Sequence, residues 1–285
     1  MAEIIREPAV AGTFYEGTKE ALSQQIEDCY THPLGPGKVP RLSSKKEGNI
    51  LGLVSPHAGY AYSGSVAAWG FYEVIKSQVP KVVIILGPNH RGFGASIAIS
   101  AKGKWKTPLG ENQIDEELAK KIVSLSSLVR FDEKAHQREH SLEVQLPFLQ
   151  YSYGGSFRIV PICMMEQDQS TACKLGEVLS RVLKGENSFL IIASTDFTHY
   201  QPKDIAERQD KKALTAILSL SPEELNRVVS RYRISMCGPG PVMAMLTATS
   251  LLGAKKARLL KYATSGDITG DYEAVVGYAS VVVER

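Results

Sequence analysis

The sequence predicts an α/β protein with a central, largely parallel sheet that helices cover on both faces. Apolar, strand-like runs alternate with helical patterns through most of the chain, and this alternation is typical of parallel sheets. Three of these runs are also followed by side chains that can bind a metal or transfer a proton, namely His57, His90, and Asp196 with His199. Because ligands bind outside the carboxyl ends of the strands in open α/β sheets, we expect these residues to share one site.

The individual elements follow from the spacing of apolar residues along the chain. Residues 6–15 (REPAVAGTFY) suit an ordered segment that lies against the body, and residues 32–48, rich in Pro, Gly, Lys and Ser, predict a loop. The predicted strands cover residues 50–54, 82–86, 95–100, 158–163, 189–193, 257–263 and 274–283. The predicted helices cover residues 20–30, 63–76, 114–125, 169–183, 205–218, 222–232 and 242–252.

Three segments carry further local signals. Ser221 is expected to cap the helix at 222–232, which has a proline at its first position and two glutamates in its first turn. Residues 136–151 become apolar at helical spacing, and Pro147 is expected to kink or interrupt that helix. Residues 103–110 are expected to form a turn-rich connection.

Composition limits the class of protein. At 285 residues, 44% of them hydrophobic and 22% charged, the chain is long enough to bury a full core. The net charge of +3 and the lack of charged runs give no sign of nucleic acid or a membrane as partner. The sequence contains no stretch typical of a signal peptide or a membrane span, so we expect a cytoplasmic protein. No break in composition predicts a second domain, so we expect one domain over residues 1–285.

The histidines at the strand ends are the first candidates for a functional site. His57 and His90 each lie in a loop bounded by Gly and Pro, where small neighbours leave room for a ligand. A single histidine in such a loop often only hydrogen-bonds the backbone, but two in equivalent positions favour a shared site. Asp196 and His199 are three residues apart, which places both on one face of a helix, unless Asp196 is simply an N-cap.

Two imidazoles with one anionic ligand form a typical site for iron, copper or zinc. A carboxylate as the anionic ligand favours non-heme Fe(II). The alternative is Cys237, in the MCGPGP loop, whose thiolate favours copper(I) and zinc without excluding iron. The four cysteines show no C-x-x-C pair, which argues against a zinc ribbon.

The residues around these candidates suggest a pocket. Tyr62 follows His57 closely in the sequence and could line the pocket. His140 could contact the substrate or support one of the metal-binding residues. His32 and His136 are expected at the surface. The sequence contains no phosphate-binding loop, no dinucleotide fingerprint and no G-x-S-x-G, which argues against nucleotide enzymes and serine hydrolases.

Six motifs in order resemble those of the Memo family: REPAVAGTFY, SPHAGYAYSG, LGPNH, EHSLEVQLPFL, STDFTHY and MCGPGP. The resemblance covers nearly the whole chain. It implies the fold of class III extradiol dioxygenases, which open catechol-type rings at a non-heme Fe(II) centre. The expected architecture is therefore a three-layer αβα sandwich with a largely parallel or mixed sheet.

The resemblance also implies roles for single residues. His57, His90 and Cys237 match the positions that form the metal site, and His199, with Asp196 beside it, matches the acid/base of the dioxygenases. Cys237 stands where the ring-opening enzymes have a carboxylate. A thiolate donates more charge and changes the redox potential of the metal, so the shared fold does not by itself imply the shared reaction.

Two functions from different classes follow. The first is a metal-dependent redox enzyme that holds iron or copper, or less readily zinc, with the substrate contacted by Tyr62, Asn89 and His140. In it, His199 transfers protons, and the substrate is a small molecule or a peptide. The second is a non-catalytic protein that binds a small molecule or a peptide in the same cleft. A zinc-dependent hydrolase is a third option, because the same ligands suit Zn²⁺ and its activated water.

Overall fold

A mixed β-sheet forms the centre of the molecule. The computed structural model describes residues 4–42, 44, 49–186 and 188–285. Within them, the main sheet has the order β10-β12-β2-β9-β3-β8-β4-β7. The strand β11 also pairs with β12, on the edge of β12 that faces away from β2. Its strands are β2 (Ile50–Ser55), β3 (Val82–Pro88), β4 (Ile97–Ile99), β7 (Val129–Phe131), β8 (Arg158–Met164), β9 (Phe189–Ser194), β10 (His199–Gln201), β11 (Lys256–Thr264) and β12 (Val275–Glu284).

The middle of this sheet is parallel and its flanks are antiparallel. The strands β2, β9, β3 and β8 are neighbours that all run in the same direction. In contrast, β12 runs antiparallel to β2, and β4 runs antiparallel to β8. The parallel strands are buried along nearly their whole length, as expected for a sheet with helices on both faces.

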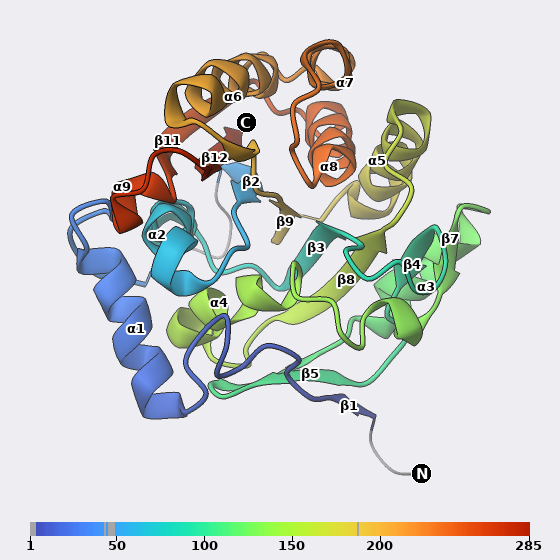
Figure 1. Ribbon diagram of the computed structural model, residues 1–285. Helices are drawn as coiled ribbons and strands as arrows, with labels where there is room; N and C mark the ends of the chain where they lie inside the picture. The colour runs from blue at the N-terminus through green and yellow to red at the C-terminus, as the bar shows by residue number, and fades with distance from the viewer. Residues whose placement is uncertain (1–3, 43, 45–48, 187) are drawn as a thin grey trace.

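Helices cover both faces of the sheet, which gives three layers (Figure 1). One layer contains α1 (Lys19–Thr31), α2 (Tyr60–Ser77) and α4 (Leu146–Tyr153). The other contains α3 (Glu116–Ser124), α5 (Gln169–Leu183), α6 (Lys203–Leu218), α7 (Pro222–Tyr232) and α8 (Pro239–Leu251), and the short α9 (Gly266–Thr269) follows β11. The predicted αβα architecture with a mixed sheet is confirmed.

Side chains of the central strands alternate between two cores. In β3, Ile84 and Leu86 join the core under α5 and α8, whereas Val83 and Ile85 join the core under α2 and α4. All four side chains are fully buried. Each contributes about 1.5–3 kcal/mol relative to an exposed position, so the strand ends that carry the candidate site are firmly held.

A small second sheet lies beside the α4 layer and corrects two expectations. It consists of β1 (Ile5–Arg6), β5 (Lys104–Thr107) and β6 (Gly110–Gln113), so residues 103–110 form part of a hairpin rather than a simple turn-rich connection. The Arg6 guanidinium lies 4.1 Å from the Trp105 ring, and that ring packs edge-on against His136. His136 is therefore fully buried, not at the surface.

Two further local predictions differ from the structure. The helix in residues 136–151 begins only at Leu146, and Pro147 lies in its first turn, where its missing N–H costs nothing. Residues 195–198 are not helical and lead directly into β10, so Asp196 and His199 do not share a helix face.

Other local predictions are confirmed. The bounds of α5 and α7 are as expected, and the Ser221 hydroxyl accepts the Glu224 N–H at the start of α7. No helix in the described part of the chain has both the length and the apolar character needed to cross a membrane.

Candidate metal centre

Three histidines meet beside the carboxyl ends of the parallel strands. His57 follows β2, His90 follows β3, and His140 lies in the segment that leads into α4. One ring nitrogen of each lies within 4.8 Å of those of the other two. The ring centroids are 4.6 Å apart for His90 and His140, 5.1 Å for His57 and His90, and 5.5 Å for His57 and His140. The expected meeting of His57 and His90 is thus observed, and His140 joins them.

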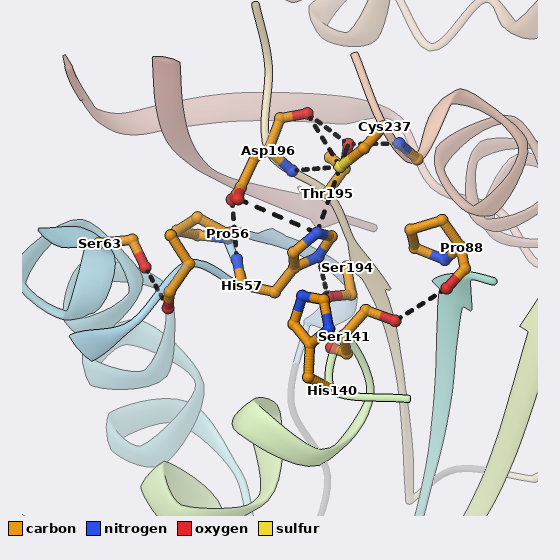
Figure 2. A network of polar contacts seen from close by, with 12 residues as sticks. Pro56, His57, Ser63, Pro88, His140, Ser141, Ser194, Thr195, Asp196 and Cys237 are labelled. Atoms are coloured by element: carbon orange, nitrogen blue, oxygen red, sulfur yellow. Dashed lines mark hydrogen bonds and ion pairs between the residues drawn. The ribbon is translucent and has the colours of Figure 1, made fainter. Parts of the chain in front are cut away.

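His57 is held in one tautomer by a hydroxyl group (Figure 2). The Ser194 hydroxyl donates to the Ser141 carbonyl at 2.6 Å, so its oxygen can only accept from its other neighbours. It accepts from Gln145 Nε2 at 2.9 Å and lies 2.8 Å from His57 Nδ1. Nδ1 of His57 therefore carries the proton, and Nε2 presents a lone pair.

The environment of His57 keeps the ring neutral. Its side chain is only 2% exposed. Burial, followed by the nearby His140 and His90, holds the pKa of His57 well below its usual value. A neutral imidazole is the form that binds metal ions.

His90 is held by a buried carboxylate. Glu139 accepts the His90 backbone N–H at 2.7 Å and His90 Nδ1–H at 2.9 Å, and it also accepts the N–H groups of His140 and Ser141. Burial acts to raise the pKa of Glu139, but the hydrogen bond and charge of His90 and the Ser141 N–H outweigh it and lower the pKa to about 2. The ionised carboxylate fixes the His90 tautomer with a lone pair on Nε2, as is common for metal-binding histidines.

His140 contributes a nitrogen that lacks a partner. Its Nδ1 is buried and lies 3.4 Å from Glu139 Oε1, and it makes no hydrogen bond within the described residues. The Phe14 ring packs on the imidazole with centroids 4.6 Å apart. Burial lowers the pKa of His140 to about 4, against the raising effect of Glu139. The ring is thus neutral near pH 7.

Cys237 lies next to His57 but outside the three-histidine group. Its Sγ is 3.2 Å from His57 Nε2 and accepts the Asp196 N–H at 3.1 Å. Its loop is fixed by Gln167, which donates to the Cys237 carbonyl at 2.9 Å. Burial first, and then the Asp196 charge, raise the pKa of the Cys237 thiol. Without a cation nearby, the sulfur is therefore a neutral thiol.

Asp196 and His199 lie on the same side of the site as Cys237. The Asp196 carboxylate accepts the His57 backbone N–H at 2.8 Å, and its second oxygen is 3.9 Å from His57 Nε2. Burial raises the pKa of Asp196 to about 6, against the lowering effect of the His57 N–H. His199 Nδ1 faces two carbonyl oxygens, those of Phe197 at 2.7 Å and Ser235 at 2.8 Å. It must donate to them, so Nε2 is the ring nitrogen that remains to exchange a proton.

The two remaining predicted residues differ in position. Tyr62 is 47% exposed in the first turn of α2. Asn89 uses its whole amide group to shape the loop after His90: Oδ1 accepts the N–H groups of Arg91 and Gly92, and Nδ2 donates to the Phe93 carbonyl. Contact of either residue with a substrate stays a prediction.

Sequence reasoning missed the groups that support the histidines. Ser194 and the role of Glu139 as partner of His90 were not foreseen, although Glu139 stands next to His140 in the sequence. The same is true of Glu143, which is buried behind the site. It pairs with Arg6 at 2.7 Å and accepts the Ala9 and Val10 N–H groups and the Tyr15 hydroxyl. Glu143 thereby attaches the N-terminal segment, including Phe14, to the His140 segment.

Comparisons with known proteins agree with this architecture. The sequence model of a family described as Memo-like protein matches residues 6–282. A MEMO1 family protein of Methanopyrus kandleri is 47% identical over 281 residues, which are 98% of this chain and 99% of that protein. A MEMO1 family protein of Ignicoccus hospitalis is 47% identical over 279 residues, 98% of each chain. An uncharacterized Escherichia coli K12 protein of known structure shares the fold alone, with a TM-score of 0.57 and 15% identity over 82% of this chain and 99% of that one.

Proposed function

Because this chain belongs to the Memo family, we propose that it binds an iron or copper ion at the three-histidine group and takes part in redox chemistry on a small molecule or a peptide. The observation that carries the proposal is the meeting of His57, His90 and His140, with one ring nitrogen of each within 4.8 Å. Neutral imidazoles at this spacing suit iron, copper and zinc.

The donor set fits a metal ion in two further respects. The Nε2 atoms of His57 and His90 carry lone pairs, because Ser194 and Glu139 hold the protons of these rings on Nδ1. At His57 this lone pair faces Cys237 Sγ, the further ligand proposed below. The ring of His140 has a buried nitrogen with no hydrogen bond in the described part of the chain, and a buried polar atom without a partner is costly. We therefore assign His140 to the metal rather than to the substrate.

Cys237 is proposed as a fourth ligand. With Zn–N bonds of about 2.0–2.1 Å and Zn–S bonds of about 2.3 Å, two ligands on one tetrahedral ion lie about 3.5 Å apart. The observed 3.2 Å between Cys237 Sγ and His57 Nε2 is close to this value. A bound cation would also favour the thiolate over the thiol, because metal binding releases the proton of a cysteine ligand.

The other residues supply proton transfer and positioning. A bound iron or copper ion would supply the electron-transfer chemistry. His199 Nε2 accepts or returns a proton, since its Nδ1 is fixed as a donor by two carbonyls. The Asp196 carboxylate accepts the His57 backbone N–H and thereby positions His57. Since burial raises its pKa to about 6, Asp196 can also exchange a proton near neutral pH. Tyr62 and Asn89 are proposed to contact the substrate.

Elemental analysis tests the proposal. The chain is purified without chelator or affinity tag, as wild type and as His57→Ala, and metal content is measured before and after anaerobic reconstitution with Fe(II) or Cu(I). His32→Ala is the control, because it removes a histidine from the end of α1 instead of the site. We expect stoichiometric iron or copper in the wild type and the control and none in His57→Ala.

Each result leads to a different conclusion. Bound iron or copper justifies a screen for oxygen consumption with catechols and other reductants. Stoichiometric zinc alone would overturn the redox proposal and favour hydrolysis. The absence of metal after reconstitution would overturn metal binding altogether, and the cleft would then be that of a binding protein.

A further inference from the structure

A cavity of about 600 Å³ is lined by two segments that are continuous in the chain with residues of the site. These are the loop after His90 and the segment that leads to Glu139 and His140. The lining residues are Phe93, Gly94, Asp132, Lys134, Gln137 and Arg138. Its volume lies within the range of about 300–1,000 Å³ that is typical of small-molecule sites.

The cavity is lined by cations without anionic partners. The side chains of Lys134 and Arg138 form no ion pair or hydrogen bond with the described residues, and Arg91 beside them donates only to the Arg138 carbonyl, at 2.9 Å. The carboxylate in the wall, Asp132, accepts the Ala95 and Lys134 backbone N–H groups. Two cations, Lys134 and Arg138, therefore line the cavity together with one carboxylate that is already hydrogen-bonded.

The loop after His90 is built to present an aromatic ring at this cavity. Asn89 holds it closed through its hydrogen bonds to Arg91, Gly92 and Phe93. The Phe93 ring is nevertheless 59% exposed. The ring therefore offers apolar surface at the cavity.

We propose that this cavity binds the anionic end, a carboxylate or a phosphate, of a small substrate whose reacting group lies at the three-histidine group. Lys134 and Arg138 hold the anion, and Phe93 contacts the apolar part of the molecule. Arginine in particular recognises carboxylate and phosphate oxygens with paired hydrogen bonds. The inference rests on the proposed function for the position of the reacting group, whereas the anion site stands on its own geometry.

Titration of the isotope-labelled full chain with small probes tests the proposal. Benzoate and phenyl phosphate carry the two candidate anions, and benzamide is the neutral counterpart of benzoate. The readouts are the dissociation constant and the shifts of the Gly94 and Gln137 amide signals. We expect both anions to shift these signals and benzamide not to, and the tighter of the two anions identifies the chemistry of the substrate.

Two double variants separate the cavity from general charge effects. Lys134→Ala with Arg138→Ala should weaken the binding of the anions by about tenfold or more, because it removes two charge-assisted contacts. Lys174→Ala with Arg181→Ala removes the same charge from a different cavity, lined by α5, and should leave binding unchanged. The thermal midpoints of both variants check that they fold.

The proposal fails if the two double variants bind benzoate equally well, or if benzamide binds as tightly as benzoate. Metal content of the same samples separates this failure from that of the proposed function. Anion binding with the expected pattern in a chain that takes up no metal would retain the anion site and overturn the redox function. Stoichiometric metal without anion binding would retain the proposed function and overturn the anion site.

Discussion

The two halves of the candidate metal centre are built differently. The sheet half consists of His57, Ser194, Asp196 and Cys237, all at or near the ends of β2, β9 and α8. Its histidine is almost fully buried and is backed by a neutral hydroxyl. The loop half consists of His90, His140, Glu139 and Glu143. Its His90 is exposed and is backed by an ionised carboxylate.

The difference suggests that the two halves orient their histidines in different ways. In the sheet half, parallel strands fix the backbone, so a weak hydroxyl contact is enough to orient His57. In the loop half, His90 follows β3 as His57 follows β2, but His140 lies in a segment outside the sheet. Two buried carboxylates tie this segment to distant parts of the chain: Glu139 accepts the His90 backbone N–H. Glu143 accepts the Ala9 N–H and the Tyr15 hydroxyl. A carboxylate also makes its histidine a stronger donor to a metal. Five variants test this comparison.

Glu143→Ala should have the largest effect on stability, and the effect should centre on the loop half. It leaves the Arg6 guanidinium, whose side chain is 9% exposed, without its carboxylate partner and with only the carbonyls of His136 and Glu139. Removing one partner of such an ion pair costs about 3–5 kcal/mol in the free energy of unfolding. The substitution also releases the N-terminal segment and with it the Phe14 ring that packs on His140. Chemical denaturation measures the loss, and hydrogen exchange should show faster opening of residues 6–15 and 136–145 than of β2 and β9.

The control is Glu73→Ala, which breaks exposed pairs with Lys76 and Arg258. Exposed pairs of this kind contribute about 0–1 kcal/mol. Equal losses in the two variants, or uniform opening of both halves, would contradict the view that Glu143 supports the loop half.

Cys237→Ser should have the largest effect on metal binding by the sheet half. A hydroxyl is a poor substitute for a thiolate, so we expect the affinity for Cu(I) to fall by more than roughly a hundredfold, beyond the loss typical of supporting residues. Competition with a chelator measures the affinity. The controls, Cys163→Ser and Cys173→Ser, change one buried and one half-buried cysteine that take no part in the site. The same loss in all three variants would refute Cys237 as a ligand.

Local patterns predicted the parts of this molecule that depend on neighbours in sequence. The strands and most helices follow from apolar spacing, and the meeting of His57, His90 and Asp196 follows from the common edge of parallel strands. The loop half was not predictable in this way. Glu139 contacts His90 across 49 residues, and Glu143 contacts Tyr15 across 128.

Side-chain hydrogen bonds to the backbone explain the two wrong local predictions. Residues 136–142 have helical spacing, but the Glu139 carboxylate accepts the N–H groups of His140 and Ser141, so the helix starts later. Asp196 accepts the His57 backbone N–H from another strand end instead of capping a helix. The first is a local hydrogen bond and the second a tertiary one, and each outweighs the helical preference.

Glu139→Gln and Ser194→Ala compare the supporting groups of the two halves directly. Loss of the carboxylate behind His90 should reduce metal affinity by about 10–100-fold, the usual range for such partners. Loss of the Ser194 hydroxyl should reduce it by less, because His57 stays packed between strand ends and keeps its backbone contact to Asp196. Metal titration of both variants in parallel gives the ratio of their metal affinities. A larger loss in Ser194→Ala would contradict the proposed difference between the two halves.

The smallest expected effect is that of His136 on the free energy of unfolding, and it is measured as a dependence on pH. Burial first, and then the Arg6 charge, lower the pKa of His136 to about 3 in the folded chain, against its ordinary value near 6.5. Between these values the unfolded chain binds a proton that the folded chain does not, so stability falls as the pH falls through 6.5. At pH 5.5 the loss amounts to about 1.4 kcal/mol, and it becomes negligible about one pH unit above 6.5.

His136→Gln removes this titration without removing Arg6 or Trp105, the two groups that cover the ring. The free energy of unfolding of the metal-free chain, measured from pH 5 to 8, should therefore fall less steeply on acidification in the variant than in the wild type. Parallel curves would show that His136 is already protonated when folded. Since His136 lies under the segment that carries Glu139 and His140, hydrogen exchange at pH 5.5 should place the acid-induced opening in the loop half, with the strand ends that hold His57 still protected.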